Sequence, residues 1–191
     1  MPIQIKPLVY DLSRDELSQI MSSWGEPRYR IDQIWRGLYE QLWQHPEQFT
    51  NLPAALRQKL SEEFHFSHLD QQAVQFSSDG ETRKTLFHLP DGQAVEAVLM
   101  TYRSRQTVCI STQAGCAMGC VFCATGQMGF RRNLTAGEIV EQVLINARDL
   151  TGKGQQLTNI VIMGMGEPFH NYENTMAAIH RLNDPDGFNF G

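Results

Sequence analysis

The four cysteines of this 191-residue chain all lie between Cys109 and Cys123. Three of them, Cys116, Cys120 and Cys123, have the spacing C-x-x-x-C-x-x-C. A disulfide framework usually spreads its cysteines along a chain, whereas a tight cluster indicates a metal, an iron–sulfur cluster or redox chemistry. This spacing constrains the fold strongly, because one short loop must present three thiols to the same ligand.

Composition narrows the class of protein. Hydrophobic residues make up 41% of the chain, which is enough for a packed core. The net charge of −5 argues against nonspecific binding of nucleic acid but permits a local basic patch. The sequence contains no signal peptide and no apolar run that could span a membrane, so we expect a cytoplasmic protein with no membrane partner.

The chain up to about residue 66 has helical patterns. Ser13 and Glu16 form a capping box, in which each side chain accepts a backbone N–H of the first turn. Apolar residues at helical spacing predict a second helix over 31–43 and a third from about Pro53. We therefore expect a small helical domain over residues 1–75.

The pattern then changes to strands. Segments 82–88 and 93–101 alternate around the turn at 90–92, and we assign 76–101 to linker strands. The expected elements that follow are a strand at 107–113, a helix at 136–150, a strand at 159–163 and a helix at 172–183. Thr135 and Glu138 form a second capping box.

Alternating strands and helices predict parallel strands with right-handed crossovers. The predicted fold class is α/β: a partial (βα) barrel over 102–191, preceded by a small helical domain and linker strands. Two such units do not close a sheet. We therefore expect either a fragment truncated at its C-terminus or a partner that completes the sheet.

Three thiolates on one loop can hold three irons of a four-iron cluster and leave the fourth iron open to a substrate. Gly115 and Gly119 permit the tight backbone that this needs, and Phe122 could shield the cluster. The alternative is a structural zinc site with Cys109 as fourth ligand. The spacing favours the cluster, because zinc sites usually pair two short cysteine motifs across a longer loop.

A second motif follows the strand at 159–163. The residues 164–168 read Gly-Met-Gly-Glu-Pro, and ligands of α/β folds bind at the carboxyl ends of strands. Glycines let the backbone approach a ligand, and Glu167 could hold an ammonium group. Such a turn alone carries little information about function.

Together the two motifs resemble those of radical S-adenosylmethionine enzymes. The run CAMGCVFCATGQMGFRRNLTAGEIVEQV resembles the methyltransferases that modify carbon 2 of an adenine in 23S ribosomal RNA, some of which also modify transfer RNA. YRIDQIWRGLYEQ resembles their accessory domain, and DGETRKTLFHLPDGQAVEAVLM their linker strands. A sister family methylates carbon 8 and shares most motifs, although ATGQMGF is closer to the carbon-2 enzymes.

The resemblance implies a 4Fe-4S cluster on Cys116, Cys120 and Cys123. Its open iron would chelate the methionine part of S-adenosylmethionine, with Gly166 and Glu167 contacting the amino group. One electron would cleave the sulfonium to a deoxyadenosyl radical. In the family, two S-adenosylmethionine molecules are used per turnover: one methylates a C-terminal cysteine, and the second gives the radical that takes a hydrogen from that methyl.

The resemblance also implies catalytic roles for Cys109, in resolving the protein–RNA adduct, and for Glu96, as proton acceptor. From the residues alone, Cys109 is a buried small apolar residue. Glu96 is either a paired carboxylate or a solvent-facing strand residue. The methyl-carrying cysteine has no match, since no cysteine follows Cys123. We therefore expect this chain to bind a cluster but not to methylate RNA alone.

The implied partners are 23S rRNA, transfer RNA as a further substrate, and an electron donor such as a flavodoxin-type protein. Clustered arginines could hold phosphates around an unstacked base, although surface charge explains any one of them. They are Arg28, Arg30, Arg36, Arg103, Arg105, Arg131 and Arg132. Two other classes stay open: a radical enzyme acting on a small molecule or peptide, and a zinc-binding module without activity.

Overall fold

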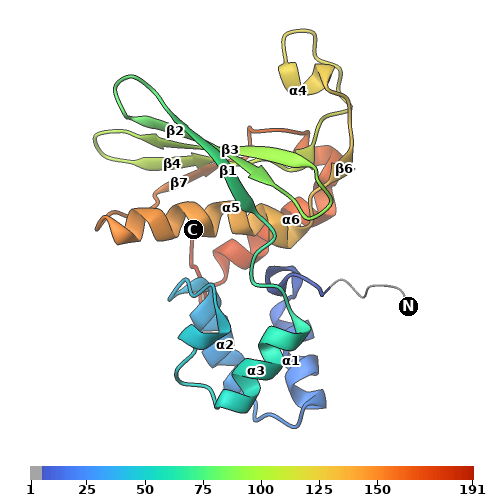
Figure 1. Ribbon diagram of the computed structural model, residues 1–191, viewed down its shortest axis with the longest axis vertical. Helices are drawn as coiled ribbons and strands as arrows, with labels where there is room; N and C mark the ends of the chain where they lie inside the picture. Colours follow the sequence, from blue (N-terminus) through green and yellow to red (C-terminus); the bar gives the residue numbers. More distant parts are fainter. Residues whose placement is uncertain (1–5) are drawn as a thin grey trace. The chain divides into compact units, whose positions relative to one another are not determined.

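The computed structural model describes residues 6–191 (Figure 1). The chain forms two compact units, Met1–Ser67 with Ile179–Gly191, and His68–Ala178. Residues 1–5 of the predicted helical domain lie outside the described residues. The domain limits predicted after residues 75 and 101 remain predictions, and they do not coincide with the limits of these units.

The first unit is helical, with α1 (Arg14–Ser23), α2 (Tyr29–Tyr39) and α3 (Ala54–Glu63), and the short 3-10 helices η1 (Val9–Asp11) and η2 (Pro46–Gln48). The predicted capping box is present, because the Glu16 N–H donates to Ser13 and the Glu16 carboxylate accepts from the Ser13 N–H. Trp35 of α2 lies in the core of this unit and is 2% exposed.

Helix α2 ends at Tyr39 rather than at residue 43 as predicted. The chain turns back after it: the Gln41 N–H donates to the Arg36 carbonyl, and Leu42 takes a left-handed φ of 57°. The reason is packing over Gly37, where a Cβ would lie 2.4 Å from the Phe49 ring. A tertiary contact therefore outweighs the apolar periodicity that favoured a longer helix.

In the described residues the second unit holds a five-stranded sheet in the order β1-β2-β3-β4-β7. Its strands are β1 (Asp70–Phe76), β2 (Thr82–His88), β3 (Ala94–Thr101), β4 (Gln106–Cys109) and β7 (Asn159–Val161). Pairs from β1 to β4 are antiparallel, and β4 pairs with β7 in parallel. The predicted parallel βα unit is confirmed. Strand β1 was not predicted, because its exposed polar residues lack a clear alternation.

The predicted strand over 107–113 ends early, at Cys109. Ser111 leaves the ladder because its N–H donates to the Gln142 side chain and its hydroxyl donates to the Glu96 carbonyl. Strand β5 (Gln113–Ala114) then pairs with β6 (Arg132–Asn133). The cysteine loop with the short helix α4 (Ala124–Gln127) leaves from this ribbon and stands away from the sheet (Figure 1).

Helix α5 (Ala136–Gly152) connects β6 to β7 and runs along one face of the sheet (Figure 1). Its predicted capping box between Thr135 and Glu138 is present. Apolar side chains of the sheet and of α5 form the core of this unit: Val95, Ala97, Leu99, Val108, Ile139, Val140, Val143 and Leu144. The chain continues through η3 (Pro168–Asn171) and α6 (Tyr172–Asn183), the latter as predicted. No helix among residues 6–191 has the length and apolarity that crossing a membrane requires.

Candidate functional site

Two loops meet at the carboxyl ends of β4 and β7. Because these strands are parallel neighbours, the segments that follow them begin at the same edge of the sheet. The Thr112 N–H donates to the Met165 carbonyl at 2.8 Å, and the Gly164 N–H donates to the Ile110 carbonyl at 3.0 Å. The segment that leads into the cysteine loop and the glycine turn therefore lie side by side.

The glycines of the turn are required by this close approach. A Cβ on Gly164 would lie 2.7 Å from the Ile110 carbonyl oxygen. Gly166 has a left-handed φ of +100°, and a Cβ there would lie 2.6 Å from the Cβ of Gln113. Any other residue would push the turn away from the segment that carries the thiols.

Glu167 is half-buried, and hydrogen bonds of its backbone and its side chain hold it in place. Its N–H donates to the Gln113 side-chain oxygen at 2.9 Å. Its Oε1 accepts the Phe169 N–H at 3.0 Å, which caps η3. Within residues 6–191 the second carboxylate oxygen accepts no hydrogen bond, so it is available to a cation at this edge.

The three clustered cysteines lie on one loop, with Cys116 buried and Cys120 and Cys123 half-exposed. Among residues 6–191 no three His, Cys, Asp or Glu side chains lie close enough to hold one metal ion. The described loop therefore holds no preformed site for a single metal ion, whereas a four-iron cluster takes one of these thiols on each of three irons. Phe122 is 90% exposed and does not cover them, because the loop stands away from the sheet.

Local chemistry nevertheless fits a thiolate ligand set. The backbone N–H groups of Gly126 and Thr125 bond the Cys123 sulfur and lower the pKa of its thiol. Gly115 and Gly119 take the left-handed φ values of 73° and 60°. A Cβ at Gly115 would lie 1.9 Å from the carbonyl oxygen of residue 129, so the neck of the loop admits only glycine there.

Glu96 and Cys109 lie on the sheet face opposite α5. Cys109 pairs with Val98 across β3 and β4, and Glu96 lies two residues from Val98 on the same face. Lys84 forms an ion pair with Glu96 at 3.1 Å, so this carboxylate is both paired and partly exposed. Burial raises the pKa of the Cys109 thiol, which the Met163 N–H partly offsets. The structure thus places both predicted residues on one face.

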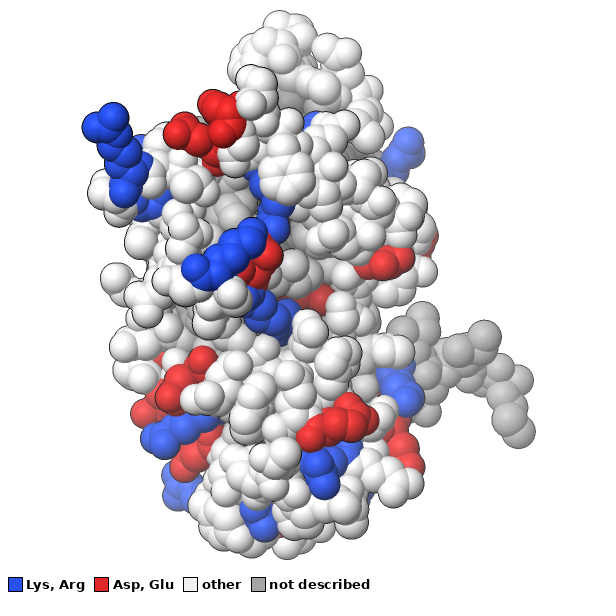
Figure 2. All heavy atoms as spheres, turned by 60° about the vertical axis from the view of Figure 1, so that its left-hand side comes forward, with Lys and Arg blue, Asp and Glu red and all other residues white. Residues whose placement is uncertain are grey.

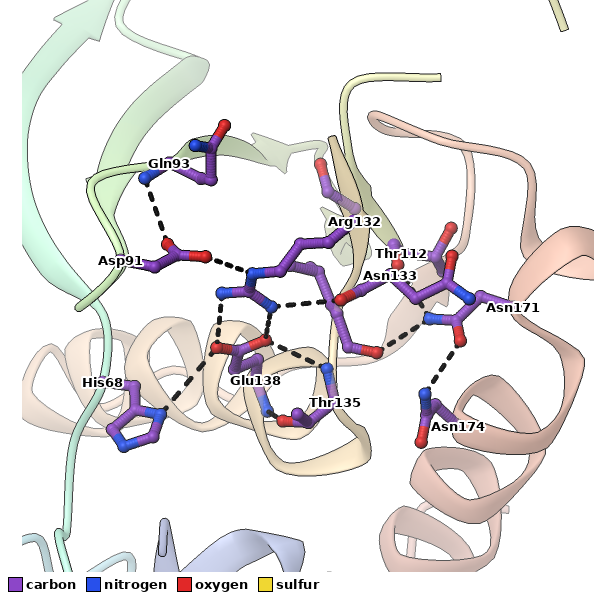
Figure 3. A network of polar contacts seen from close by, with 12 residues as sticks. His68, Asp91, Gln93, Thr112, Arg132, Asn133, Thr135, Glu138, Asn171 and Asn174 are labelled. Carbon is purple, nitrogen blue, oxygen red and sulfur yellow. Dashed lines mark hydrogen bonds and ion pairs between the residues drawn. The ribbon is translucent and has the colours of Figure 1, made fainter. Parts of the chain in front are cut away.

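Arg132 anchors the end of the cysteine loop (Figure 3). Its guanidinium lies between Asp91, in the β2–β3 turn, and Glu138, at the start of α5. The two bonds to Glu138 measure 2.7 and 3.0 Å. Arg132 is therefore engaged by the protein, and its neighbour Arg131 is the exposed cation of the pair.

Glu138 is 3% exposed and remains ionised. Burial alone would raise the pKa of this carboxyl. Hydrogen bonds from His68, Arg132 and the Thr135 backbone outweigh burial and lower the pKa of Glu138 to about 2. Hydrogen bonds to Glu138 and Asp91 raise the pKa of Arg132.

Known proteins match this chain over nearly its whole length. Residues 9–65 match the family described as ribosomal RNA large subunit methyltransferase N-terminal domain. A probable dual-specificity RNA methyltransferase RlmN of Chloroflexus aurantiacus is 51% identical, over 96% of this chain and 50% of the relative. The dual-specificity RNA methyltransferase RlmN 1 of Myxococcus xanthus is 49% identical, over 100% of this chain and 53% of the relative.

This chain is an RlmN homologue. The crystal structure of a radical SAM methyltransferase from Sphaerobacter thermophilus agrees, with a TM-score of 0.93 at 49% identity, over 97% of this chain and 54% of that chain. The predicted resemblance to this family of RNA methyltransferases and the predicted α/β fold class are both confirmed. The chain spans about half the length of the curated RlmN relatives that it matches.

Three polar side chains of this RlmN homologue were not predicted from its sequence. Gln113 and Asn133 join the two loops, and Asn171 donates to the carbonyls of Thr112 and Leu134 at 2.8 Å each. The sequence signal that could have identified Gln113 is the polar run 111–113. It directly follows an apolar strand, at a position where burial is expected. Buried polar side chains need partners, and theirs come from distant segments.

Proposed function

We propose that this chain is part of a radical SAM methyltransferase that adds a methyl group to carbon 2 of an adenine in 23S rRNA, with transfer RNA as a second substrate. One observation carries the proposal: in an RlmN homologue, the base of a three-thiol loop adjoins the Gly164–Glu167 turn at the ends of two parallel strands. The two ring nitrogens bonded to carbon 2 make it electron-poor, so polar methylation there is unfavourable and radical chemistry is the alternative.

The residues present fit the cofactors that such chemistry requires. Cys116, Cys120 and Cys123 would hold a 4Fe-4S cluster, which leaves one iron open. Bound there, the cluster supplies the single electron for reductive cleavage of S-adenosylmethionine. The free oxygen of Glu167 and the backbone of Gly166 would bind the amino group of its methionine part, since a carboxylate and an ammonium group attract at this half-buried edge.

Glu96 and Cys109 are the groups on the sheet face that can act on the substrate. Glu96 would accept a proton from the modified base, and Lys84 holds this carboxylate in an ion pair at 3.1 Å. Cys109 would act as the thiol that resolves an adduct between protein and RNA. Its half-buried position keeps the thiol protonated until a base or a partner approaches.

The RNA would be held by scattered cations rather than by one large basic surface. Figure 2 shows lysine and arginine side chains interspersed with acidic ones on the face in view. Arg28, Arg36 and Arg131 are exposed and could contact phosphates. A flavodoxin-type protein would supply the electron, and this partner follows from the family rather than from a surface of this chain.

The first experiment is anaerobic reconstitution of the chain with iron and sulfide. We expect about four irons per chain and a broad brown absorption that shifts when S-adenosylmethionine is added. The triple variant C116A/C120A/C123A should bind no cluster, whereas C109A, which keeps the three loop thiols, should bind it normally. A colourless chain that contains zinc, or an unchanged iron content in the triple variant, would contradict the proposal.

A further inference from the structure

We propose that Gln113 is a positioning residue for S-adenosylmethionine, which fixes the Gly166–Glu167 turn against the base of the cysteine loop. The inference rests on the proposed function and deepens it. It assigns a role to a side chain that would touch neither the iron nor the substrate. Gln113 would act through Glu167 on one side and through β6 on the other.

The contacts of Gln113 join three segments. Its side chain is 1% exposed. The Oε1 atom accepts the Glu167 N–H at 2.9 Å, and the Nε2 group donates to Asn133 Oδ1 at 2.8 Å. Its backbone N–H donates to the Met165 carbonyl at 3.2 Å. A primary amide suits this place, because it offers one acceptor and one donor without a charge whose burial would be costly.

The glycine turn is shaped around Gln113. A Cβ on Gly166 would lie 2.6 Å from Gln113 Cβ, 2.7 Å from its Cγ and 2.7 Å from its backbone nitrogen. The left-handed φ of +100° at Gly166 then directs the Glu167 N–H to the Gln113 side chain. The position of Glu167 is therefore set by contact on one side and by a hydrogen bond on the other.

The opposite side of Gln113 is anchored by the network at the base of the loop. Gln113 pairs with Asn133 in the β5–β6 ribbon, and Arg132 is held by Asp91 and Glu138 (Figure 3). Asn171 joins the two residues that flank this ribbon, 112 and 134, by donating to the carbonyls of both. Gln113 thus links this network to the turn that would bind the methionine amino group, and it fixes the position of that turn.

The requirement for such a link follows from the shape of the ligand. The methionine part of S-adenosylmethionine would have to meet both a cluster held by the loop thiols and the turn after β7. A small change in the spacing of two contact points weakens a ligand that must meet both. The buried amide of Gln113 holds the two segments at one spacing in the described structure.

The test compares Q113M and Q113E with the unsubstituted chain after reconstitution. Methionine keeps the length of the side chain but accepts no N–H from Glu167, whereas glutamate keeps an acceptor there. Q71M, at an exposed glutamine of β1, is the matched control. The measurements are iron content, the concentration of S-adenosylmethionine that gives half of the absorption shift, and hydrogen exchange of the 165–168 backbone in the cluster-free chain.

We expect Q113M to bind iron normally but to need roughly tenfold more S-adenosylmethionine, the effect of leaving a buried N–H unpaired. Hydrogen exchange at Glu167 should be faster in Q113M than in Q113E, which keeps an acceptor for that N–H, and Q71M should match the unsubstituted chain. If Q113M does not fold, N133A, which removes the partner of Gln113 on β6, undergoes the same test with the same criteria.

The outcomes separate this inference from the proposed function. An unsubstituted chain whose absorption does not respond to S-adenosylmethionine overturns both. A normal response in the unsubstituted chain with the same affinity in Q113M overturns the role of Gln113 alone. Loss of iron from Q113M in parallel with loss of S-adenosylmethionine binding also overturns it, because the side chain would then only support the fold of the loop.

Discussion

Replacing Glu138 by glutamine should destabilise the second unit at neutral pH and much less in acid. Glu138 is 3% exposed and makes two hydrogen bonds to Arg132, so the substitution removes one of the two counter-ions of a partly buried guanidinium and leaves only Asp91. The pKa of this carboxyl falls from 4.5 to about 2 on folding, which corresponds to roughly 3 kcal/mol of stability above the unfolded pKa.

The sign of the pH dependence follows from the direction of that shift. A carboxyl with a lowered pKa binds its proton more readily in the unfolded chain, so its contribution is complete above about pH 4.5 and disappears as the pH falls toward 2. The difference in unfolding free energy between the unsubstituted chain and E138Q should therefore be roughly 3 kcal/mol at pH 7 and should shrink steadily below pH 5.

The assay is urea unfolding followed by far-ultraviolet circular dichroism at several pH values. E173Q, at an exposed position in the first turn of α6, is the control and should change stability by less than about 0.5 kcal/mol. A difference for E138Q that stays constant from pH 7 to pH 3 would refute the linkage. A difference below about 1 kcal/mol at pH 7 would show that desolvation cancels the ion pair.

Two further predictions rest on single positions. G166A should destabilise the second unit by several kcal/mol, because the position combines a φ of +100° with a Cβ that would lie 2.6 Å from Gln113. G152A, at the last residue of α5 with open space around it, should be neutral or stabilising by about 0.5–1 kcal/mol. Equal effects of the two substitutions in thermal unfolding would contradict this. In the cluster-free, reduced chain, iodoacetamide should modify Cys123 before Cys109 at pH 7–8, because hydrogen bonds lower the first thiol pKa and burial raises the second. Peptide mass spectrometry measures the order, and equal rates would contradict it.

The parts of the fold that were predicted from the sequence are those fixed by local interactions. The capping boxes at Ser13 and Thr135 involve residues three positions apart, so their helices begin where the sequence indicates. The strand over 107–113 was predicted too long. Ser111 forms hydrogen bonds to α5 and β3 instead of continuing the hydrogen-bond ladder of the strand. Those partners are distant in sequence, and periodicity carries no information about them.

The candidate site also combines features that are local in sequence with features that depend on distant partners. The thiol spacing and the glycine turn are visible in the sequence because each motif is continuous along the chain. Gln113 and Arg132 were not recognised as structural links, because their roles depend on Glu167, Glu138 and Asp91, which approach them only in the fold. A single glutamine or arginine has no pattern that separates a buried link from a surface side chain.

The loop that bears the thiols combines a fixed base with an exposed end. Its base is held by Arg132 and by the β5–β6 ribbon, whereas Val121 and Phe122 at its end are 88% and 90% exposed. Ligation of a cluster by the three thiols would order this exposed end, and part of the binding free energy would be spent on that ordering. The base can stay in place meanwhile, since its anchors belong to the sheet and to α5. Under the proposed function, cluster binding should therefore protect residues 117–130 from hydrogen exchange and leave the protection of 111–114 unchanged.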